Sequence, residues 1–256
     1  MPEQDYRGTV ALITGGSDGI GADTARQMAA RGAAVAVNFH TGEGKAKELV
    51  DTIVAAGGKA IAVGADVTDA EQVAAMVAET VTRLGPIDVL VLNATGLYGR
   101  DVPFLPFAQV SWSYLERTVT RQMQSLFFPL QTVLPAMIER GSGSVVAVGA
   151  ALSRTPSAGL LAISMAKAAL EALVKSLARE VGPMGVRVNG VGPGFILSAA
   201  TAEAPEFLVQ AAAERAALRR NGVPADVASA ITYLASPQAS YLTGSYVLVD
   251  GGTAMV

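Results

Sequence analysis

Three glycines near the amino terminus are the first residues whose types and spacing could do chemistry. Gly15, Gly19 and Gly21 lie in the stretch TGGSDGIG, between an apolar run that favours a strand and a segment with a helical period. Glycines at this spacing let the chain turn sharply, bring backbone N–H groups against a pyrophosphate and let the helix pack closely on the sheet. The phosphate charge would then lie at a helix N-terminus, which favours anions. The stretch therefore predicts a dinucleotide-binding site.

The same stretch matches a second pattern, which we reject. Gly15 to Gly19 reads G-x-S-x-G, the turn that presents a nucleophilic serine in α/β-hydrolases. That chemistry needs a histidine late in the chain. The only histidine, His40, comes just after the second predicted strand, so we do not expect a hydrolase.

A lysine within an apolar run is the second candidate for a chemical role. Lys167 is the one ionisable residue in SAGLLAISMAKAAL, Ser157 to Leu170, a segment with a helical period. One helical turn earlier stands Ile163, which can neither donate nor accept a proton. Lys167 therefore has no ionisable neighbour within this stretch.

The elements that must position these residues alternate between strands and helices. Seven apolar runs are typical of strands covered on both faces, at 9–14, 33–39, 59–66, 88–93, 144–149, 186–192 and 245–250. Segments with a helical period lie between them, at 20–31, 44–56, 70–84, 110–140, 157–181 and 224–235. This alternation predicts an α/β fold of Rossmann-like type, a doubly wound parallel seven-stranded sheet with helices on both faces. We expect one dinucleotide-binding domain over 1–256, with substrate-facing insertions near 95–107 and 195–220, because both follow carboxyl ends of strands.

The composition excludes several classes of protein. A chain of 256 residues, 51% hydrophobic and 16% charged, can bury its apolar surface in one core. Its net charge of −3, without a basic block, argues against nucleic-acid and membrane partners. A polar start and no long apolar run lead us to expect a cytoplasmic location. With no cysteine and one histidine, we expect no disulfide, no thiolate catalysis and no metal site.

Beyond these patterns, the chain resembles the short-chain dehydrogenase/reductase family over essentially its whole length, and is similar to the 3-oxoacyl-acyl-carrier-protein reductase branch. TGGSDGIG matches the family's TGxxxGIG, and GADVTD, LNATG, RVNGVGPGFILS and YLTGSYVLVDGG match later segments. LNATG keeps Asn93 and Ala94 of the family's NNAG but has Leu92 and Thr95 beside them. The resemblance implies a cofactor site made of Gly15, Ser17, Asp18, Gly19, Ile20, Gly21, Phe39, His40, Thr41, Asp66, Val67, Asn93, Ala94, Lys167, Pro193, Gly194, Ile196 and Ser198.

The residues after the second strand favour NADP(H) over NAD(H). An acid there would bind the ribose 2′-OH of NAD, whereas a basic residue would accept the 2′-phosphate of NADP. Phe39 and His40 take that place, so no acid repels the phosphate, and His40 or Lys45 could assist it. Two observations weigh the other way: Asp18 stands where many NADP-using relatives carry a basic or neutral residue, and His40 also fits an ordinary exposed loop residue.

The catalytic half of the resemblance is incomplete. Members of the family combine an asparagine, a serine, a tyrosine and a lysine to bind a carbonyl and to protonate the product. Lys167 matches the lysine, while Gln122, Ala150 and Ile163 take the asparagine, serine and tyrosine positions. Tyr98 is then the remaining phenol to consider, with Ser153 and Ser164 behind it. Lys167 also holds the nicotinamide ribose in the family, so its retention fits cofactor binding without chemistry as well.

Three functions stay open on this basis. The first is an atypical oxidoreductase that acts on a carbonyl or on an activated enoyl or ketoacyl substrate, polyketide-like ones included, without the usual serine and tyrosine. The second is a catalytically inactive subunit that supports an active paralogue in a hetero-oligomer. The third is a non-redox cyclase or dehydratase that uses Gln122 or Arg100. We expect a small-molecule or acyl-thioester substrate, and a homo-oligomer (dimer or tetramer) or a hetero-oligomer formed through the long helices at 110–140 and 157–181.

Overall fold

The computed structural model describes residues 5–95 and 104–255. Within these residues seven parallel strands form one sheet, in the order β3-β2-β1-β4-β5-β6-β7. The strands are β1 (Val10–Ile13), β2 (Ala34–Phe39), β3 (Lys59–Gly64), β4 (Val89–Leu92), β5 (Gly143–Val148), β6 (Val186–Pro193) and β7 (Tyr246–Val249). Each lies within two residues of its predicted bounds, so the predicted fold class is confirmed.

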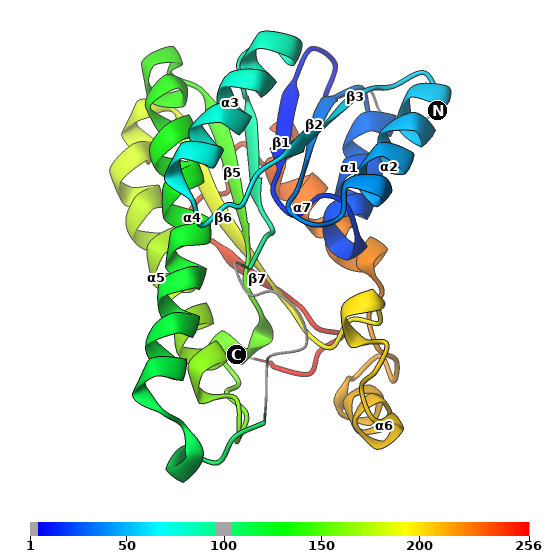
Figure 1. The fold of residues 1–256 in the computed structure, drawn as a ribbon, viewed down its shortest axis with the longest axis vertical. Coiled ribbons are helices and arrows are strands. Elements are labelled where there is room, and N and C mark those ends of the chain that lie inside the picture. The colour runs from blue at the N-terminus through cyan, green and yellow to red at the C-terminus, as the bar shows by residue number, and fades with distance from the viewer. Residues whose placement is uncertain (1–4, 96–103, 256) are drawn as a thin grey trace.

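Helices cover both faces of this sheet (Figure 1). Three of them share one hydrophobic cluster with the strands: α3 (Ala70–Leu84), α4 (Trp112–Arg140) and α5 (Leu161–Val181). Three others share the cluster on the opposite face: α1 (Gly19–Ala30), α2 (Glu43–Ala55) and α7 (Pro224–Ala235). Short 3-10 turns complete the described elements: η1 (Phe107–Gln109), η2 (Ala151–Ser153), η3 (Gly182–Met184), η4 (Ala199–Thr201) and η5 (Pro237–Ala239).

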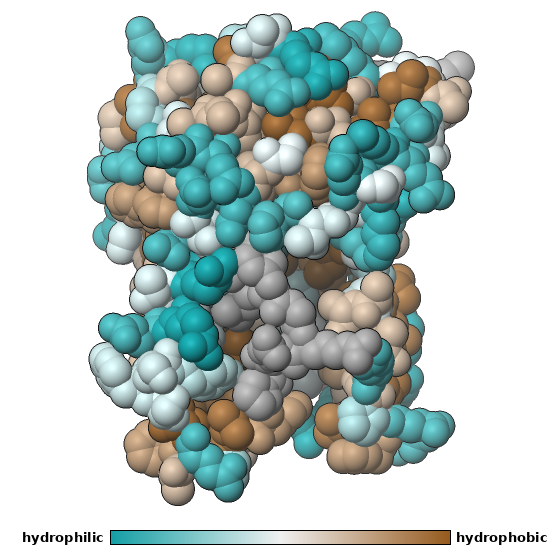
Figure 2. All heavy atoms as spheres, in the orientation of Figure 1, coloured by the Kyte–Doolittle hydropathy of each residue, from teal (hydrophilic) through white to brown (hydrophobic). Residues whose placement is uncertain are grey.

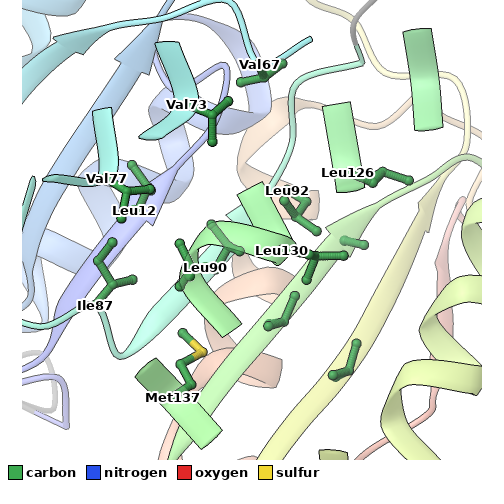
Figure 3. Packing of buried hydrophobic residues seen from close by; sticks show 14 of the residues in the cluster. Leu12, Val67, Val73, Val77, Ile87, Leu90, Leu92, Leu126, Leu130 and Met137 are labelled. Atoms are coloured by element: carbon green, nitrogen blue, oxygen red, sulfur yellow. The ribbon is translucent and has the colours of Figure 1, made fainter. Parts of the chain in front are cut away.

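The cores follow from the alternation of side chains along each strand. Leu12 belongs to the cluster on the α4 side, whereas Ala11 and Ile13 belong to the cluster on the α1 side. Figure 3 shows the first cluster, in which sheet and helix side chains meet: Leu12, Leu90 and Leu92 with Val73, Val77, Leu126, Leu130 and Met137. Because both faces of the strands are buried, their sequences are almost continuously apolar.

The start of α5 differs from the sequence prediction. The helix begins at Leu161 rather than at Ser157. Gly159 has φ +80°, a left-handed conformation that helical residues do not adopt, and Pro156 lies just before this turn. Leu105 N donates to Gly159 O at 3.0 Å, so this turn is tied to the segment that precedes α4.

The predicted insertion near 195–220 contains one further helix, α6 (Glu206–Arg215), as its alanine-rich sequence indicated. None of the residues of α6 is buried. Figure 2 shows hydrophilic residues over most of the upper part of this face, with apolar residues gathered at its lower end, around α6 and the start of α4. Among the large exposed side chains are Phe107 in η1, Trp112 at the start of α4 and Phe207 in α6, which are 80%, 73% and 67% exposed. Most of the other predicted insertion, at 96–103, lies outside the described residues.

The order of the strands places a ligand site at one edge of the sheet. The chain proceeds from β1 to β3 in one direction and from β4 to β7 in the other, so the loops after β1 and β4 diverge. In open α/β sheets the crevice at such a point, outside the carboxyl ends of the strands, binds ligands. The predicted glycine-rich turn follows β1 at this position.

No helix in the part of the chain that the structure describes is long and apolar enough to cross a membrane.

Candidate dinucleotide and catalytic site

The glycine-rich turn after β1 has the backbone geometry that glycine allows. Gly15 and Gly19 have φ values of +60° and +52°. A Cβ at Gly21 would lie 2.3 Å from Gly15 O, so the first turn of α1 packs directly on the loop. Asn93 holds this arrangement from the end of β4, because its Nδ2 donates to Thr14 O at 3.0 Å and to Gly15 O at 2.9 Å. The N-terminal amides of α1 are thereby presented at the carboxyl edge of the sheet.

A cavity of about 410 Å³ opens beside this turn. Many of the residues that the sequence predicted for the cofactor line it together, and the lining consists of Gly15, Ser17, Asp18, Asn38, Phe39, His40, Thr41, Gly42, Lys45, Ala65, Val67, Ala94 and Thr95. Asp66 lies beside it: its Oδ2 is 4.0 Å from His40 Nε2 and 3.6 Å from Arg121 Nη2. The loops after β1, β2, β3 and β4 therefore line one common cavity.

Asn38 is a residue of this site that sequence reasoning missed. Its side chain is buried within β2, where Oδ1 accepts from Gly15 N at 3.1 Å and Nδ2 donates to Ala65 O at 3.1 Å. Gly16 N also donates to Asn38 O, at 2.7 Å. Asn38 thus fixes the glycine-rich turn against the loop after β3. An asparagine inside the apolar run AAVAVNF was the available signal, since a buried amide needs hydrogen-bond partners.

An ion pair between Asp18 and Lys45 stands at the wall of this cavity. Asp18 caps α1, and its Oδ1 accepts from Gly19 N at 2.7 Å. The hydrogen bond from Lys45 lowers the pKa of Asp18, and the same bond raises the pKa of Lys45. Both residues therefore carry full charges near neutral pH.

The loop after β6 brings the second group of predicted cofactor residues to the same edge. A Cβ at Gly194, next to Pro193, would lie 2.8 Å from Asp250 Cα, so this glycine permits close packing against the end of β7. Ile196 forms a parallel bridge with Gly222. Ser198 lines a second cavity, of about 340 Å³, together with Ser17, Asp18, Gly19 and Lys45. The structure thus brings Ser198 together with the residues predicted near α1, while Gly194 and Ile196 shape the segment that leads to it.

Lys167 is buried in α5, with 5% of its surface exposed. Its Nζ donates to Val148 O, at the end of β5, over 3.4 Å, which is a long hydrogen bond. Burial lowers the pKa of Lys167 to about 8. Ile163, one turn earlier on the helix, is 9% exposed and supplies no polar atom. Lys167 is therefore a poorly solvated amine beside an apolar neighbour.

Ala150, which the sequence predicts at the serine position, is held by a tyrosine that the sequence did not single out. The Tyr246 hydroxyl accepts from Ala150 N at 2.9 Å and donates to Ala150 O at 3.0 Å. The ring fits where Gly190 and Gly192 carry no side chain, since a Cβ at either would lie within 2.7 Å of it. Burial raises the pKa of Tyr246, so this phenol is a weaker acid than free tyrosine. Its hydroxyl fixes the backbone at residue 150.

An ionic cluster around the buried Glu171 supports the same loop. Glu171 accepts hydrogen bonds from Ser153, Arg154 and Lys175, at 3.0, 2.9 and 2.7 Å. Burial by itself raises the pKa of Glu171, but these hydrogen bonds outweigh it and lower the pKa to about 2. The Arg154 guanidinium also lies 5.4 Å from the centre of the Tyr246 ring. Ser153, a weaker catalytic candidate from the sequence, is therefore engaged in this cluster.

Gln122, which the sequence predicts at the asparagine position, is buried in α4. Its Nε2 donates to Ser125 Oγ at 3.2 Å, while its Oε1 has no hydrogen-bond partner among the described residues. Ser164 Oγ, in α5, is likewise without a partner there. Tyr98 and Arg100 lie outside the described residues. Among the residues that the structure does describe, no cluster of His, Cys, Asp and Glu side chains could hold a metal ion.

Known proteins match this chain over nearly its whole length. The family model described as Enoyl-(Acyl carrier protein) reductase matches residues 15–254. The 3-oxoacyl-acyl-carrier-protein reductase FabG of Staphylococcus aureus is 35% identical over 245 residues, which cover 96% of this chain and 98% of that protein. The match therefore extends over nearly the whole length of both proteins.

Three solved structures match with similar coverage. A mutant of a Serratia marcescens short-chain dehydrogenase/reductase has a TM-score of 0.89 and 32% identity, over 98% of this chain and 100% of that one. A 7α-hydroxysteroid dehydrogenase complexed with NADH and 7-oxo glycochenodeoxycholic acid has a TM-score of 0.90 and 31% identity, over 98% and 96%. A blue fluorescent protein from a metagenomic library, in complex with NADPH, has a TM-score of 0.86 and 33% identity, over 98% and 100%.

Proposed function

This chain belongs to the short-chain dehydrogenase/reductase family, and from that premise we propose that it is an NADP(H)-dependent reductase of activated enoyl or ketoacyl thioesters. One observation carries the proposal: a glycine-rich cradle that fits a dinucleotide lies at the same sheet edge as the predicted catalytic positions, two of which are apolar. Ala150 and Ile163 occupy those positions, while Lys167 is retained and buried.

The residues at the sheet edge fit a dinucleotide. The positive φ values of Gly15 and Gly19, and the contact that leaves no room for a side chain at Gly21, give the space that a pyrophosphate requires. The amides of α1 face this space, and the cavity of about 410 Å³ beside it suits an adenosine group. When bound, the nicotinamide supplies the hydride. Lys167 is the residue of this chain that would hold the ribose next to it.

The missing hydroxyls decide which substrates we propose. Reduction of a ketone leaves an alkoxide, which needs a proton and a nearby hydrogen-bond donor. Ala150 and Ile163 offer neither, and the loss of one such donor typically costs about 3 kcal/mol in the barrier. Addition of hydride to an activated alkene instead leaves a carbanion stabilised by the thioester, which water can protonate. An enoyl thioester therefore places the smaller demand on this site.

The surroundings of the site support a substrate with an apolar chain. Phe107 and Trp112, before and at the start of α4, and Phe207 on α6 are exposed aromatic side chains on the segments that follow β4 and β6. Both segments leave the carboxyl edge of the sheet, where the cofactor residues lie. Such side chains could cover an acyl chain, since apolar groups gain free energy when they leave water.

The test is NADPH oxidation with a panel of enoyl and 3-oxoacyl thioesters, with cofactor binding measured separately by calorimetry. We expect turnover with at least one enoyl thioester and much slower turnover with the matched 3-oxoacyl thioester. Silence across the panel, with NADPH binding intact, would contradict the reductase proposal.

A second candidate function is that of a non-catalytic subunit that binds an active paralogue. The observation that favours it is the exposed apolar surface of the two long helices: Phe127 on α4 is 52% exposed and Met165 on α5 is 46% exposed. A copurified paralogue after co-expression would support this function, whereas a uniform homo-oligomer with no partner would count against it.

The cytoplasmic location stays a prediction.

A further inference from the structure

Tyr246, in β7, reaches the end of β5 although β6 lies between the two strands (Figure 1). Its ring packs on β6 at Gly190 and Gly192, where a Cβ would lie 2.6 and 2.7 Å from ring atoms. A Cβ at Gly149 would lie 2.0 Å from the Tyr246 hydroxyl. Three glycines thus leave room for this one side chain, which is 6% exposed. A side chain at any of them would displace the ring, because buried groups are closely packed.

The Tyr246 hydroxyl binds both backbone groups of Ala150. It accepts from Ala150 N at 2.9 Å and donates to Ala150 O at 3.0 Å. Ser153 N also donates to Ala150 O, at 3.1 Å. Residue 150 has little freedom to shift or rotate, because either movement would lengthen at least one of these bonds.

Arg154 connects this tyrosine to α5. Its guanidinium lies 5.4 Å from the centre of the Tyr246 ring, and its Nη2 donates to Tyr246 O at 3.3 Å. The same guanidinium donates to Glu171 Oε1, from Nε at 3.1 Å and from Nη2 at 2.9 Å. Both partners can be bound at once, because a guanidinium carries five N–H groups in one plane.

Glu171 places this connection on the helix that carries the other predicted catalytic positions. Its side chain is buried in α5, one helical turn after Lys167. Ile163 precedes Lys167 by one turn, so the three side chains share one face of the helix. Tyr246, Arg154 and Glu171 therefore join β7, the loop after β5 and α5.

We propose that Tyr246 is a positioning residue, which together with Arg154 and Glu171 fixes residue 150 relative to residues 163 and 167 of α5. The proposal rests on the proposed function, since these are the positions at which the reaction is expected. Tyr246 acts through the backbone of Ala150 and does not touch the substrate. Such positioning matters for the rate, because a displacement of about 1 Å can slow a reaction by about 100-fold.

A tyrosine that served stability alone provides the matched control. Tyr6 is 1% exposed, and its hydroxyl donates to the backbone oxygen of Thr232, in α7. It belongs to the hydrophobic cluster on the opposite face of the sheet from Tyr246. Tyr6→Phe and Tyr246→Phe each remove a hydroxyl that is bound to a backbone carbonyl. Both should lower the stability of the protein, whereas only Tyr246→Phe should release residue 150.

The experiment compares kcat, KM and the Kd of NADPH in the wild type, Tyr246→Phe and Tyr6→Phe, with the enoyl thioester that the wild type reduces fastest. Tyr246→Phe should lower kcat by about tenfold or more and change KM and Kd by less than about twofold, because it alters no group that binds the cofactor. Tyr6→Phe should leave all three constants within about twofold of the wild type. In Ala150→Ser/Ile163→Tyr, with a 3-oxoacyl thioester, Tyr246→Phe should slow turnover at least as much, because the new hydroxyl moves with the backbone at residue 150.

Hydrogen exchange of the Ala150 amide gives a readout that needs no turnover. This amide donates to the Tyr246 hydroxyl, so its exchange should be about tenfold faster in Tyr246→Phe and unchanged in Tyr6→Phe. Arg154→Met is the second variant. It keeps the Tyr246 hydroxyl and removes the connection to Glu171, so kcat should again fall by about tenfold. If Tyr246→Phe does not fold, Arg154→Met decides the question.

The outcomes separate this inference from the function on which it rests. If the wild type reduces no thioester but binds NADPH, the proposed function fails, and the exchange of the Ala150 amide still decides whether Tyr246 holds residue 150. A folded Tyr246→Phe variant with an unchanged kcat would overturn the inference, as would an Ala150 amide that exchanges as slowly as in the wild type. An equal loss of kcat in Tyr6→Phe would also overturn it, because the effect would then be one of stability.

Discussion

The burial of Lys167 predicts how the stability of the protein changes with pH. Replacement of Lys167 by methionine keeps a long unbranched side chain in α5 and removes the amine. Burial lowers the pKa of Lys167 from 10.5 to about 8, so the folded protein holds this proton less tightly than the unfolded chain does. The gap between the two values corresponds to about 3 kcal/mol of folding free energy. Lys167→Met should therefore be more stable than the wild type at pH 7 by about 3 kcal/mol.

The sign of the pH dependence follows from the two protonation states. Below about pH 8 the folded protein must carry an ammonium group in a poorly solvated place, so the wild type bears the full loss of folding free energy. Between about pH 8 and 10.5 the unfolded chain still binds the proton that the folded protein has released, so the wild type gains stability as the pH rises. Above about pH 10.5 both states are neutral, and the difference between wild type and variant should vanish.

The assay is urea unfolding of the cofactor-free protein, in steps from about pH 6 to pH 11, with the free energy of unfolding compared between variants. Leu170→Met is the matched control, because Leu170 is fully buried less than one turn further along α5 and carries no charge. Its difference from the wild type should not change with pH. A Lys167→Met variant that is less stable than the wild type at pH 7, or whose difference is constant up to pH 11, would refute the reasoning.

Three further predictions concern the neighbours of Lys167. Ala150→Ser/Ile163→Tyr should raise the rate of 3-oxoacyl thioester reduction by at least about 100-fold, because it supplies an oxyanion donor and an acid; an unchanged rate with NADPH bound would count against the assigned positions. Tyr246→Phe should lower the free energy of unfolding by about 1–3 kcal/mol, because it leaves the Ala150 N–H without its acceptor, whereas Ala150 O keeps its hydrogen bond from Ser153 N; urea unfolding checks this, and a loss below about 0.5 kcal/mol would contradict it. The pKa of Glu171 is lowered to about 2, so its stabilising effect is complete above about pH 4.5 and is lost as the pH falls towards 2. The wild type should therefore lose its advantage over Glu171→Gln in acid unfolding, and a constant difference down to pH 2 would exclude this role.

The fold could be predicted from the sequence because the strands and helices carry local signals. Strands covered on both faces have continuous apolar runs, and α3 and α7 begin and end at the predicted residues. The start of α5 was predicted too early, because an apolar helical pattern does not reveal the left-handed backbone at Gly159. Boundaries depend on single dihedral angles, whereas the existence of a helix depends on many residues together.

The candidate site could be predicted only in part, for a similar reason. The glycine-rich turn acts through residues that are close in sequence, so Gly15, Gly19 and Gly21 were found directly. Tyr246 was missed because it meets Ala150 across 96 positions of the chain, where β7 and β5 flank β6. Asn38 was missed because its partners Gly15 and Ala65 come from the loops after β1 and β3, which flank β2 in the sheet.

The sequence by itself determined which atoms are available for chemistry. No folding can give Ala150 or Ile163 a hydroxyl group, so the sequence alone showed that these two side chains can donate no proton. Only the tertiary structure decided how the remaining groups behave. It placed Lys167 out of water, paired Asp18 with Lys45 and fixed residue 150 through Tyr246. Burial and ion pairing depend on distances between residues that are remote in sequence, and the folded chain alone sets those distances.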